Sequence, residues 1–409
     1  MTPDIKSLTR DELAARFAEW EQPVYRVAQL LDWLYVQRAM NWESMTNLPK
    51  ALREKLRDNF GLQVLDLVRK QGARDTTQKF LWRLADHSLI ESVLIPASPS
   101  FYGEVSDRHT LCVSTQVGCA YGCKFCASGL DGWKRNLTSD EIIEQVMAVE
   151  RWNASECSKG LAEITTEEAR DPANGKLVSA SKDRLIDNLV VMGMGEPLAN
   201  YDQLLRALRI LNAPWGGRLG ARKITISTSG LAPQIRKLAD EPEQFRLAVS
   251  LHGATDEVRQ KIMPVNRKFP LRELTAALDY YQAKKNKMLT FEYILIAGVN
   301  DSLEQTRPLA GLAGRLFAKV NLIPYNAVEG LPWARPDEET CEAFLAALKQ
   351  QKVICTLRRE KGHDIDAACG QLRLRTEMEL AEDGKGIEPQ MKPRFRSAKS
   401  EFHPGSICG

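Results

Sequence analysis

The chain has 409 residues, enough for one large domain and a smaller appendage. Hydrophobic residues make up 44% and charged residues 27%, as in ordinary globular proteins, and no apolar run approaches the roughly 20 residues of a membrane span. The net charge of +3 indicates no particular partner. Nine cysteines, with a polar N-terminus unlike a signal peptide, favour a reducing cytoplasm over a secreted disulfide framework.

Helical periodicity dominates residues 1–60. Apolar residues recur at three- and four-residue steps around a break at Pro23, and a second amphipathic run extends over 48–60. Its polar side carries the basic residues Lys50, Arg53, Lys55 and Arg57. Such a face could bind phosphates, but the residues alone favour a merely solvated helix surface.

Two alternating runs, Lys79–Leu84 and Ser88–Ile95, predict a β-hairpin with its turn near Asp86. We assign this hairpin to a linker region over 61–104. Glu91 lies in the second run between apolar neighbours, where an acid most often faces solvent.

From residue 105 to 376, short β-branched runs alternate with helical stretches, which predicts βα units and a parallel sheet. The predicted strands are Leu111–Thr115, Ile186–Met192, Lys223–Ser227, Arg246–Leu251, Leu289–Ile296 and Lys319–Tyr325. The predicted helices between them are Ser139–Arg151, Tyr201–Leu211, Pro233–Ala239, Leu271–Lys285 and Leu303–Leu316. Six such units make an α/β fold, a partial (β/α)6 barrel, in which chemistry gathers at the carboxyl ends of the strands.

Three further segments complete the predicted organisation. Residues 153–185 are polar and read as a peripheral insertion. A helix over Cys341–Gln350 and a last strand over Val353–Arg358 follow the barrel units. Residues 377–409 lack periodicity and predict a flexible basic tail.

The first predicted strand leads into three cysteines, Cys119, Cys123 and Cys126, in a C-x3-C-x2-C spacing. Gly118 and Gly122 supply the backbone freedom for a tight loop. Thiolates bind zinc or iron–sulfur clusters, and three ligands from one loop leave one iron of a cluster open to chemistry. The alternatives are a structural metal site and three buried thiols that bind no metal.

Short segments rich in polar residues lie at the ends of four of the other predicted strands. The candidate positions in them are Gly195 and Glu196, then Ser227, then Ser250, Leu251 and His252, and finally Asn326. Each could simply form a turn, but together they surround one end of the predicted barrel, as the binding of a small polar ligand requires. Cys369 lies between small residues and a glycine, so it is accessible enough to be a reactive thiol, although a buried structural thiol is the simpler alternative.

The cysteine spacing resembles that of radical S-adenosylmethionine (SAM) enzymes. Three longer motifs make the chain similar to the RlmN-type RNA adenine-C2 methyltransferases over residues 10–376, outside the insertion. They are Leu111-Cys-Val-Ser-Thr-Gln-Val-Gly-Cys119, Met192-Gly-Met-Gly-Glu-Pro-Leu198 and Asp364-Ile-Asp-Ala-Ala-Cys-Gly-Gln-Leu372.

This resemblance implies a two-stage methyl transfer. Cys369 takes a methyl group from one SAM, a radical made from a second SAM removes hydrogen from that group, and the carbon adds to C2 of an adenine. Cys112 then releases the RNA by forming a disulfide with Cys369, and Glu91 accepts the C2 proton. The implied [4Fe-4S] ligands are Cys119, Cys123 and Cys126, and the implied SAM-contacting positions are Gly195, Glu196, Ser227, Ser250, Leu251, His252 and Asn326.

The implied substrates are an adenine of 23S rRNA at the peptidyl-transferase centre and the adenine 3′ of the tRNA anticodon. Residues 1–60 then become an RNA-binding accessory domain. A reductase such as flavodoxin would supply electrons to a cytoplasmic monomer with no membrane contact. Two alternatives stay open. Cfr-type enzymes methylate C8 of the same rRNA adenine, but Pro197 and Ser229 look more like the C2 enzymes. A non-catalytic zinc-containing RNA-binding protein would leave Cys112 and Cys369 without a role.

Overall fold

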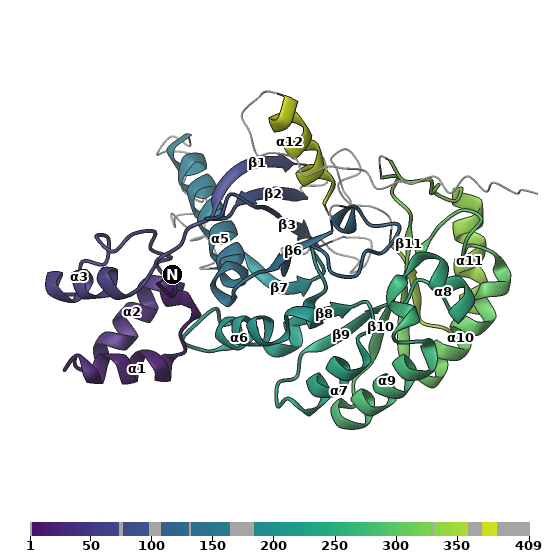
Figure 1. The fold of residues 1–409 in the computed structure, drawn as a ribbon, viewed down its shortest axis with the longest axis horizontal. Coiled ribbons are helices and arrows are strands. Elements are labelled where there is room, and N and C mark those ends of the chain that lie inside the picture. The colour runs from purple at the N-terminus through teal and green to yellow at the C-terminus, as the bar shows by residue number, and fades with distance from the viewer. Residues whose placement is uncertain are drawn as a thin grey trace, which may run out of the picture.

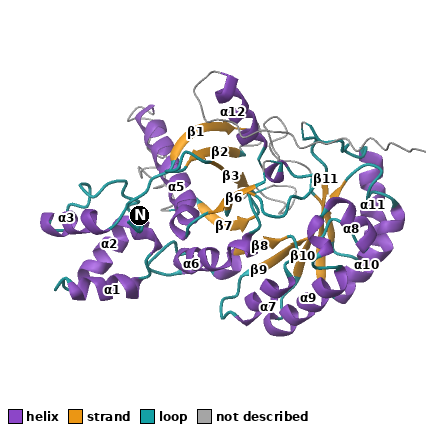
Figure 2. Ribbon diagram, viewed as in Figure 1, coloured by secondary structure: helices purple, strands orange, loops and turns teal. Residues whose placement is uncertain are grey.

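The computed structural model describes residues 2–72, 77–97, 108–130, 132–163, 184–328, 330–358 and 370–382. Its framework is a ten-stranded sheet in the order β1-β2-β3-β4-β7-β8-β9-β10-β11-β12. The sheet curves, and helices cover its outer side (Figures 1 and 2). Because β1 and β12 are the two ends of this order, the barrel is partial, as predicted.

The barrel strands follow the predicted order and are parallel. They are β4 (His109–Cys112), β7 (Ile186–Val191), β8 (Ile224–Thr228), β9 (Arg246–Ser250), β10 (Leu289–Leu295), β11 (Ala318–Pro324) and β12 (Cys355–Leu357). Six of them correspond to the six predicted units, and β12 adds a seventh parallel strand beside β11. Their β-branched and aromatic runs suit a sheet that is covered on its outer face.

Helices connect the parallel strands and bury their apolar stripes against the sheet. They are α5 (Ser139–Glu163), α6 (Tyr201–Asn212), α7 (Ala232–Asp240), α8 (Asp256–Ile262), α9 (Leu271–Lys285), α10 (Thr306–Arg315) and α11 (Glu338–Gln350). The short α8 was not predicted from the sequence. One continuous apolar core joins these helices to the strands.

The predicted hairpin is confirmed, but its assignment to a linker is wrong. Strands β2 (Gln78–Arg83) and β3 (Leu89–Pro96) pair antiparallel, and β1 (Asp66–Gly72) adds a third strand. Strand β3 pairs directly with β4, so the hairpin extends the barrel sheet. The sequence pattern shows each strand but not the non-local pairing of β3 with β4. Helix α12 (Gln371–Glu382), which was also not predicted, packs against β3 and crosses the predicted tail boundary at 377.

The predicted insertion begins later than 153. Helix α5 continues to Glu163, so it takes in the first eleven residues of the stretch assigned to the insertion. Ala154, Glu156 and Lys159 are good helix formers, so this polar segment extends the helix rather than leaving it. The remainder of the stretch, 164–183, lies outside the described residues.

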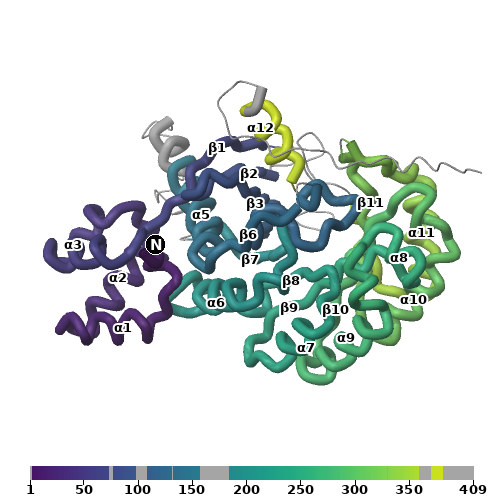
Figure 3. The backbone as a smooth tube through the Cα atoms, in the orientation of Figure 1, coloured from purple at the N-terminus to yellow at the C-terminus, as the bar shows by residue number. Residues whose placement is uncertain are grey.

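Helices α1 (Arg10–Glu19), α2 (Tyr25–Tyr35) and α3 (Lys50–Asn59) form the N-terminal helical module, as predicted. In Figure 3 they lie beside α5 and α6 at one side of the barrel. Thr9 and Glu12 form a capping box at the start of α1. The buried Lys6 pairs with Glu144 of α5 at 3.4 Å, which attaches the module to the barrel. Among the described helices, none combines the length and the apolar character needed to span a membrane.

Candidate active site

The cysteine loop departs from a small hairpin formed by β5 (Gln116–Gly118) and β6 (Trp133–Asn136). Gly118 has φ +76° and Gly122 has φ +52°, which confirms the predicted need for glycine. A Cβ on Gly118 would lie 2.0 Å from the carbonyl oxygen of Gly132, so no other residue fits there. The loop therefore depends on a backbone conformation that L side chains rarely adopt.

The three cysteines of this loop are not joined in disulfide bonds, and each is partly exposed. Burial raises the pKa of Cys119, and it raises the pKa of Cys123 well above its usual value, with added repulsion from Cys126 and Cys119. The Cys126 N–H donates to the Cys123 carbonyl at 3.1 Å, so the loop turns back on itself between these two cysteines. In the described part of the chain, no three His, Cys, Asp or Glu side chains form a single-ion metal site. In a [4Fe-4S] cluster each thiolate binds a different iron, so three thiols on one glycine-rich loop fit that group by their donor chemistry.

Two side chains outside the cysteine motif fasten the loop. Gln116 Oε1 accepts the N–H of Ala120 at 3.3 Å and that of Glu196 at 2.9 Å, which ties the cysteine loop to the loop after β7. Trp333 Nε1 donates to the Lys124 carbonyl at 2.8 Å. The sequence pattern indicated no role for Gln116 or Trp333. Gln116 lies within the Leu111–Cys119 motif that carries the family resemblance, whereas Trp333 lies in none of the three motifs.

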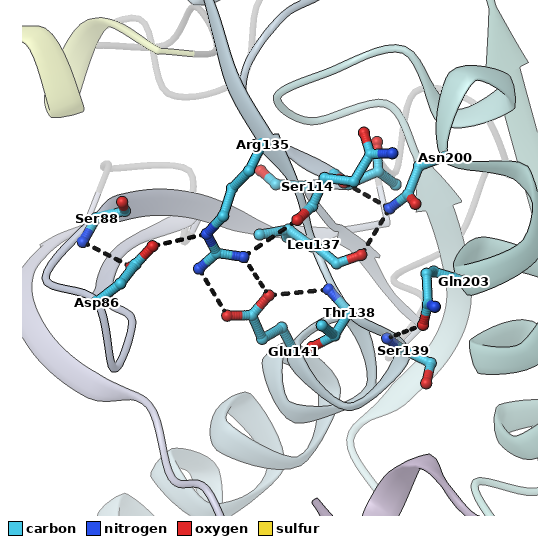
Figure 4. A network of polar contacts seen from close by, with 12 residues as sticks. Asp86, Ser88, Ser114, Arg135, Leu137, Thr138, Ser139, Glu141, Asn200 and Gln203 are labelled. Carbon is cyan, nitrogen blue, oxygen red and sulfur yellow. Dashed lines mark hydrogen bonds and ion pairs between the residues drawn. The ribbon is translucent and has the colours of Figure 1, made fainter. Parts of the chain in front are cut away.

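A polar network holds the far end of the same hairpin (Figure 4). Arg135 Nη1 and Nη2 each donate to the Glu141 carboxylate at 2.8 Å, and its Nε donates to Asp86 at 2.6 Å. Asn200 Nδ2 donates to the carbonyls of Thr115 and Leu137. The hairpin that carries the cysteine loop is thereby joined to the β2–β3 turn, α5 and the segment after β7.

Gly195 and Glu196 follow β7, as predicted. Gly195 has φ +100°, and a Cβ there would lie 2.6 Å from the Cβ of Gln116. The Glu196 carboxylate accepts the Thr228 hydroxyl at 2.8 Å and the Ser229 N–H at 2.7 Å. Burial raises its pKa, although these hydrogen bonds oppose the rise. The carboxylate therefore joins the end of β7 to the end of β8, a role that the sequence did not indicate.

Ser227, Ser250, Leu251 and His252 lie at the adjoining ends of β8 and β9. The two serine hydroxyls are 3.5 Å apart, and the N–H groups of Leu251 and His252 both donate to the Glu292 carbonyl. His252 Nδ1 accepts the Ile294 N–H at 3.0 Å, which leaves the ring proton on Nε2. Burial lowers the pKa of His252 to about 3, so the ring is neutral. Its edge meets Phe125 of the cysteine loop, with 4.9 Å between ring centroids.

A cavity of about 280 Å³ lies inside the barrel, bordered by β3, β4, β7, β10, β11 and the cysteine loop. Of the SAM-contacting positions that the resemblance implies, Asn326 lines it, whereas the polar groups at the ends of β8 and β9 are not among its described lining residues. Cys112, Cys126 and Asn326 all line it, together with Met192 and Arg358. Cys112 ends β4 and is 6% exposed. The cavity thus brings together three residues that were singled out from distant parts of the sequence.

Glu91 lies on β3 and is 2% exposed, so it does not face solvent as an acid in a strand usually does. Its Oε2 accepts the N–H of Gly370 at 2.7 Å and pairs with Lys79 at 3.1 Å. Its Oε1 accepts the N–H of Arg373 at 2.7 Å. Glu91 therefore caps the first turn of α12. Cys369 itself lies outside the described residues, directly before this cap.

A partial α/β barrel with a three-cysteine loop beside the strand ends is the architecture of a radical SAM enzyme. Residues 176–309 match the family model of the radical SAM superfamily, and residues 3–61 match that of the ribosomal RNA large subunit methyltransferase N-terminal domain. A radical SAM methyltransferase from Sphaerobacter thermophilus superposes with a TM-score of 0.78 and 41% identity over 90% of this chain and 98% of its own. Enzymes of this class use a [4Fe-4S] cluster and SAM.

Curated relatives extend over nearly the whole chain. A probable dual-specificity RNA methyltransferase RlmN 3 of Opitutus terrae is 54% identical over 92% of this chain and 96% of its own length. The probable dual-specificity RNA methyltransferase RlmN of Akkermansia muciniphila is 49% identical over 92% of this chain and 97% of its own. The chain belongs to the RlmN family of radical SAM methyltransferases.

Proposed function

We propose that this protein methylates C2 of an adenine in 23S rRNA and of the adenine 3′ of the anticodon in tRNA, through a methyl group carried on Cys369. The relatives named as dual-specificity RNA methyltransferases support RNA as the substrate. The observation that carries the proposal is the cavity of about 280 Å³, because it is lined by both Cys112 and Cys126. A thiol for covalent chemistry and a thiol of the cluster loop thus border the same space.

Cys119, Cys123 and Cys126 would hold the [4Fe-4S] cluster, which supplies one electron for the cleavage of SAM. The strand-end groups Ser227, Ser250, Leu251, His252 and Asn326, with Gly195 and Glu196, would bind SAM. The neutral His252 ring offers an Nε2–H donor and no charge. The Glu196 carboxylate also accepts donors of this chain, so it would shape the SAM-binding loops as well as contact SAM.

In this proposal the adduct radical on the adenine loses one electron, which the oxidised cluster would take back, and Glu91 accepts the C2 proton. The Cys112 thiolate then attacks the Cys369 sulfur: the S–S bond forms as the C–S bond of the thioether breaks, and the released carbon takes up a proton to become the new methyl group. Both Glu91 oxygens accept N–H groups at the start of α12, and a protonated carboxyl group accepts hydrogen bonds more weakly, so uptake of the proton would weaken this cap. The release step and the start of α12 are therefore coupled.

The N-terminal helices would bind RNA. The basic face of α3 supports this, since the side chain of Lys50 is 84% exposed and that of Arg57 52% exposed, with surface partners. Lys50 pairs with Glu54 at 3.8 Å and Arg57 with Glu43 at 3.3 Å, and a phosphate can replace such exposed partners. We further expect a monomer in the cytoplasm that takes its electrons from a reductase such as flavodoxin.

An anaerobic assay on 23S rRNA and tRNA, followed by mass spectrometry of the nucleosides, tests the proposal. We expect 2-methyladenosine from both RNAs. A methyl group on C8 alone would show Cfr-type chemistry instead, and unmodified tRNA would remove the second substrate. A Cys123→Ala variant should lose iron and sulfide, and normal cluster content in that variant would contradict the assignment of the ligands.

A further inference from the structure

Arg259 and Arg373, both with 0% exposure, are the two largest fully buried side chains in the described part of the chain. Arg259 lies on α8, whose first turn Thr255 caps by accepting the Val258 N–H. Burial lowers the pKa of Arg259 to about 10, so the guanidinium keeps its charge at neutral pH. A buried cation normally requires an anionic partner.

The hydrogen-bond partners of this guanidinium are neutral. Its Nε donates to the Leu251 carbonyl at 3.1 Å, its Nη2 donates to the Ser229 carbonyl, and its Nη1 donates to Asn266 Oδ1 at 2.8 Å. The guanidinium group of Arg259, whose nitrogens form a hydrogen-bonding fork, thus joins the end of β8 to the end of β9. None of the described carboxylates forms an ion pair with it.

The backbone around Arg259 is shaped to admit it. A Cβ on Gly253 would lie 2.6 Å from the Arg259 backbone nitrogen, and a Cβ on Gly230 would lie 3.1 Å from its Nη2. The same helix also holds the cysteine loop, because the Ile262 carbonyl accepts the Lys124 N–H at 2.9 Å. Helix α8 therefore contacts both the proposed SAM-binding strand ends and the cysteine loop.

Two acidic groups interact with the Arg259 charge, the Cys123 thiol of the cysteine loop and Asp256 on the same helix. The Asp256 carboxylate already accepts Asn266 Nδ2 at 2.9 Å and the Leu271 N–H at 2.8 Å. The cysteine loop itself lies against α8, since Ile262 accepts the N–H of Lys124, which directly follows Cys123. A cluster bound by three thiolates is anionic, and adding one electron from an external donor makes it more negative. A fixed cation beside it favours the reduced form, most strongly in a site shielded from water.

We propose that Arg259 is a positioning residue with two linked effects: its fork holds the SAM-binding ends of β8 and β9 together, and its charge beside Cys123 raises the reduction potential of the cluster. The inference rests on the proposed assignment of Cys123 as a cluster ligand. Substitution of Arg259 can therefore separate the effect of its charge on the reduction potential from the effect of its hydrogen bonds on SAM binding.

The test compares Arg259→Lys and Arg259→Gln with Lys261→Gln in the full-length, cluster-loaded protein without RNA. Lys261 is on the same helix, but its side chain is 56% exposed, so its charge is screened. Redox titration followed by electron paramagnetic resonance gives the potential, and equilibrium dialysis gives the dissociation constant of SAM. Iron and sulfide content and a thermal melt check folding.

We expect Arg259→Gln to lower the potential and to weaken SAM binding. Arg259→Lys should keep the potential near that of the parent, because the charge remains, yet weaken SAM binding about tenfold, because the fork is lost. Lys261→Gln should change neither quantity. If Arg259→Gln fails to fold, Arg259→Lys still tests the hydrogen-bonding geometry, and Arg259→Met, which keeps an unbranched stem without the charge, tests the electrostatic effect.

An unchanged potential in a well-folded Arg259→Gln protein would overturn the electrostatic effect, and parent-like SAM affinity in Arg259→Lys would overturn the positioning effect. A parent protein that binds no cluster would instead contradict the ligand assignment in the proposed function. The reduction potential and the SAM affinity are measured without RNA, so they do not depend on methylation activity. The proposed function and the proposed role of Arg259 can therefore be contradicted independently.

Discussion

The Glu91 carboxylate accepts the backbone N–H of Gly370 at 2.7 Å, across 279 positions of sequence. Gly370 directly follows Cys369, and a second hydrogen bond from the Arg373 N–H fixes the start of α12 to the same carboxylate. Lys79, 1% exposed, balances the charge at 3.1 Å. The residue expected to accept a proton is thus also the anchor of the helix that follows the proposed methyl-carrying cysteine.

Glu91→Gln should destabilise the fold as well as stop catalysis. The amide cannot accept both N–H groups as the carboxylate does, and Lys79 loses the negative charge that faces it. Removing one member of a buried ion pair typically costs 3–5 kcal/mol, so we expect a loss of about 3 kcal/mol in the free energy of unfolding. Anaerobic urea unfolding measures it.

Glu379→Gln is the matched control, since Glu379 lies on the same helix and pairs with Arg69 at the surface. It should leave stability nearly unchanged. If both variants unfold at the same urea concentration as the parent, the hydrogen bonds from Glu91 to α12 contribute no measurable stability, and Glu91 acts only in catalysis.

Substitutions of the two proposed reactive thiols should fail in different ways. Cys112→Ala removes the thiol that resolves the adduct, so the protein should remain covalently attached to its RNA. Cys369→Ala removes the methyl carrier and should give neither adduct nor product. Denaturing gels with labelled RNA distinguish the two outcomes. Free methylated RNA from Cys112→Ala at the normal rate would refute the resolving role.

Gly195→Ala should disrupt the contact between the cysteine loop and the proposed SAM-binding loop. Its φ of +100° is unfavourable for alanine, and the new Cβ would meet Gln116, which holds both Ala120 and Glu196. We expect a loss of roughly 1–3 kcal/mol in stability and weaker SAM binding, measured by urea unfolding and dialysis.

Gly311→Ala provides the comparison for that substitution. Gly311 lies in α10 without a positive φ, and a Cβ added to it would meet no atom within 4 Å. Alanine there should stabilise the protein by about 0.5–1 kcal/mol. Parent-like SAM affinity in Gly195→Ala would show that the close approach to Gln116 is unimportant.

Asp140, at the start of α5, should make stability depend on pH. Burial raises its pKa to about 6, with repulsion from Asp4 and Glu141 adding to the rise and a hydrogen bond from Thr138 opposing it. The folded protein therefore holds this proton more tightly than the unfolded chain, whose value is 3.8. As pH rises through this window the free energy of unfolding falls, by roughly 3 kcal/mol in all.

Asp140→Asn should therefore be more stable than the parent at pH 7.5, and about half of that advantage should vanish at pH 5. Urea unfolding at the two pH values measures the difference. Asp202→Asn, in the first turn of α6 with an 88% exposed side chain, is the control. A pH-independent difference for Asp140→Asn would mean that the carboxyl group does not bind a proton in this range.

The barrel was predictable because its signals are local. Each parallel strand is a short β-branched run followed by a helical period, and the predicted Leu271–Lys285 helix agrees with α9 at both ends. What escaped prediction depends on contacts between distant segments. Strand β1 is held by pairing with β2, and α12 by the Glu91 cap, and neither pairing has a sequence pattern of its own.

The candidate active site likewise combines features that local sequence predicts with features that depend on distant contacts. The glycines of the cysteine loop could be predicted, because a positive φ is a property of one residue. Arg259 could not, since an arginine on a short polar helix resembles an ordinary surface residue. Glu91 was expected to face solvent until the family resemblance gave it a role, because burial depends on α12 and Lys79.

By itself, the sequence determined the chemistry of this protein: the spacing of three thiols, the order of βα units and the motifs that place it in its family. Those features depend on residues close together in the chain, whose spacing limits what they can bind. Tertiary structure alone decided that Glu91 caps α12, that Glu196 joins two strand ends and that Arg259 is a buried cation that joins the ends of β8 and β9. Each of these follows from desolvation and from contacts across the fold, which no local pattern encodes.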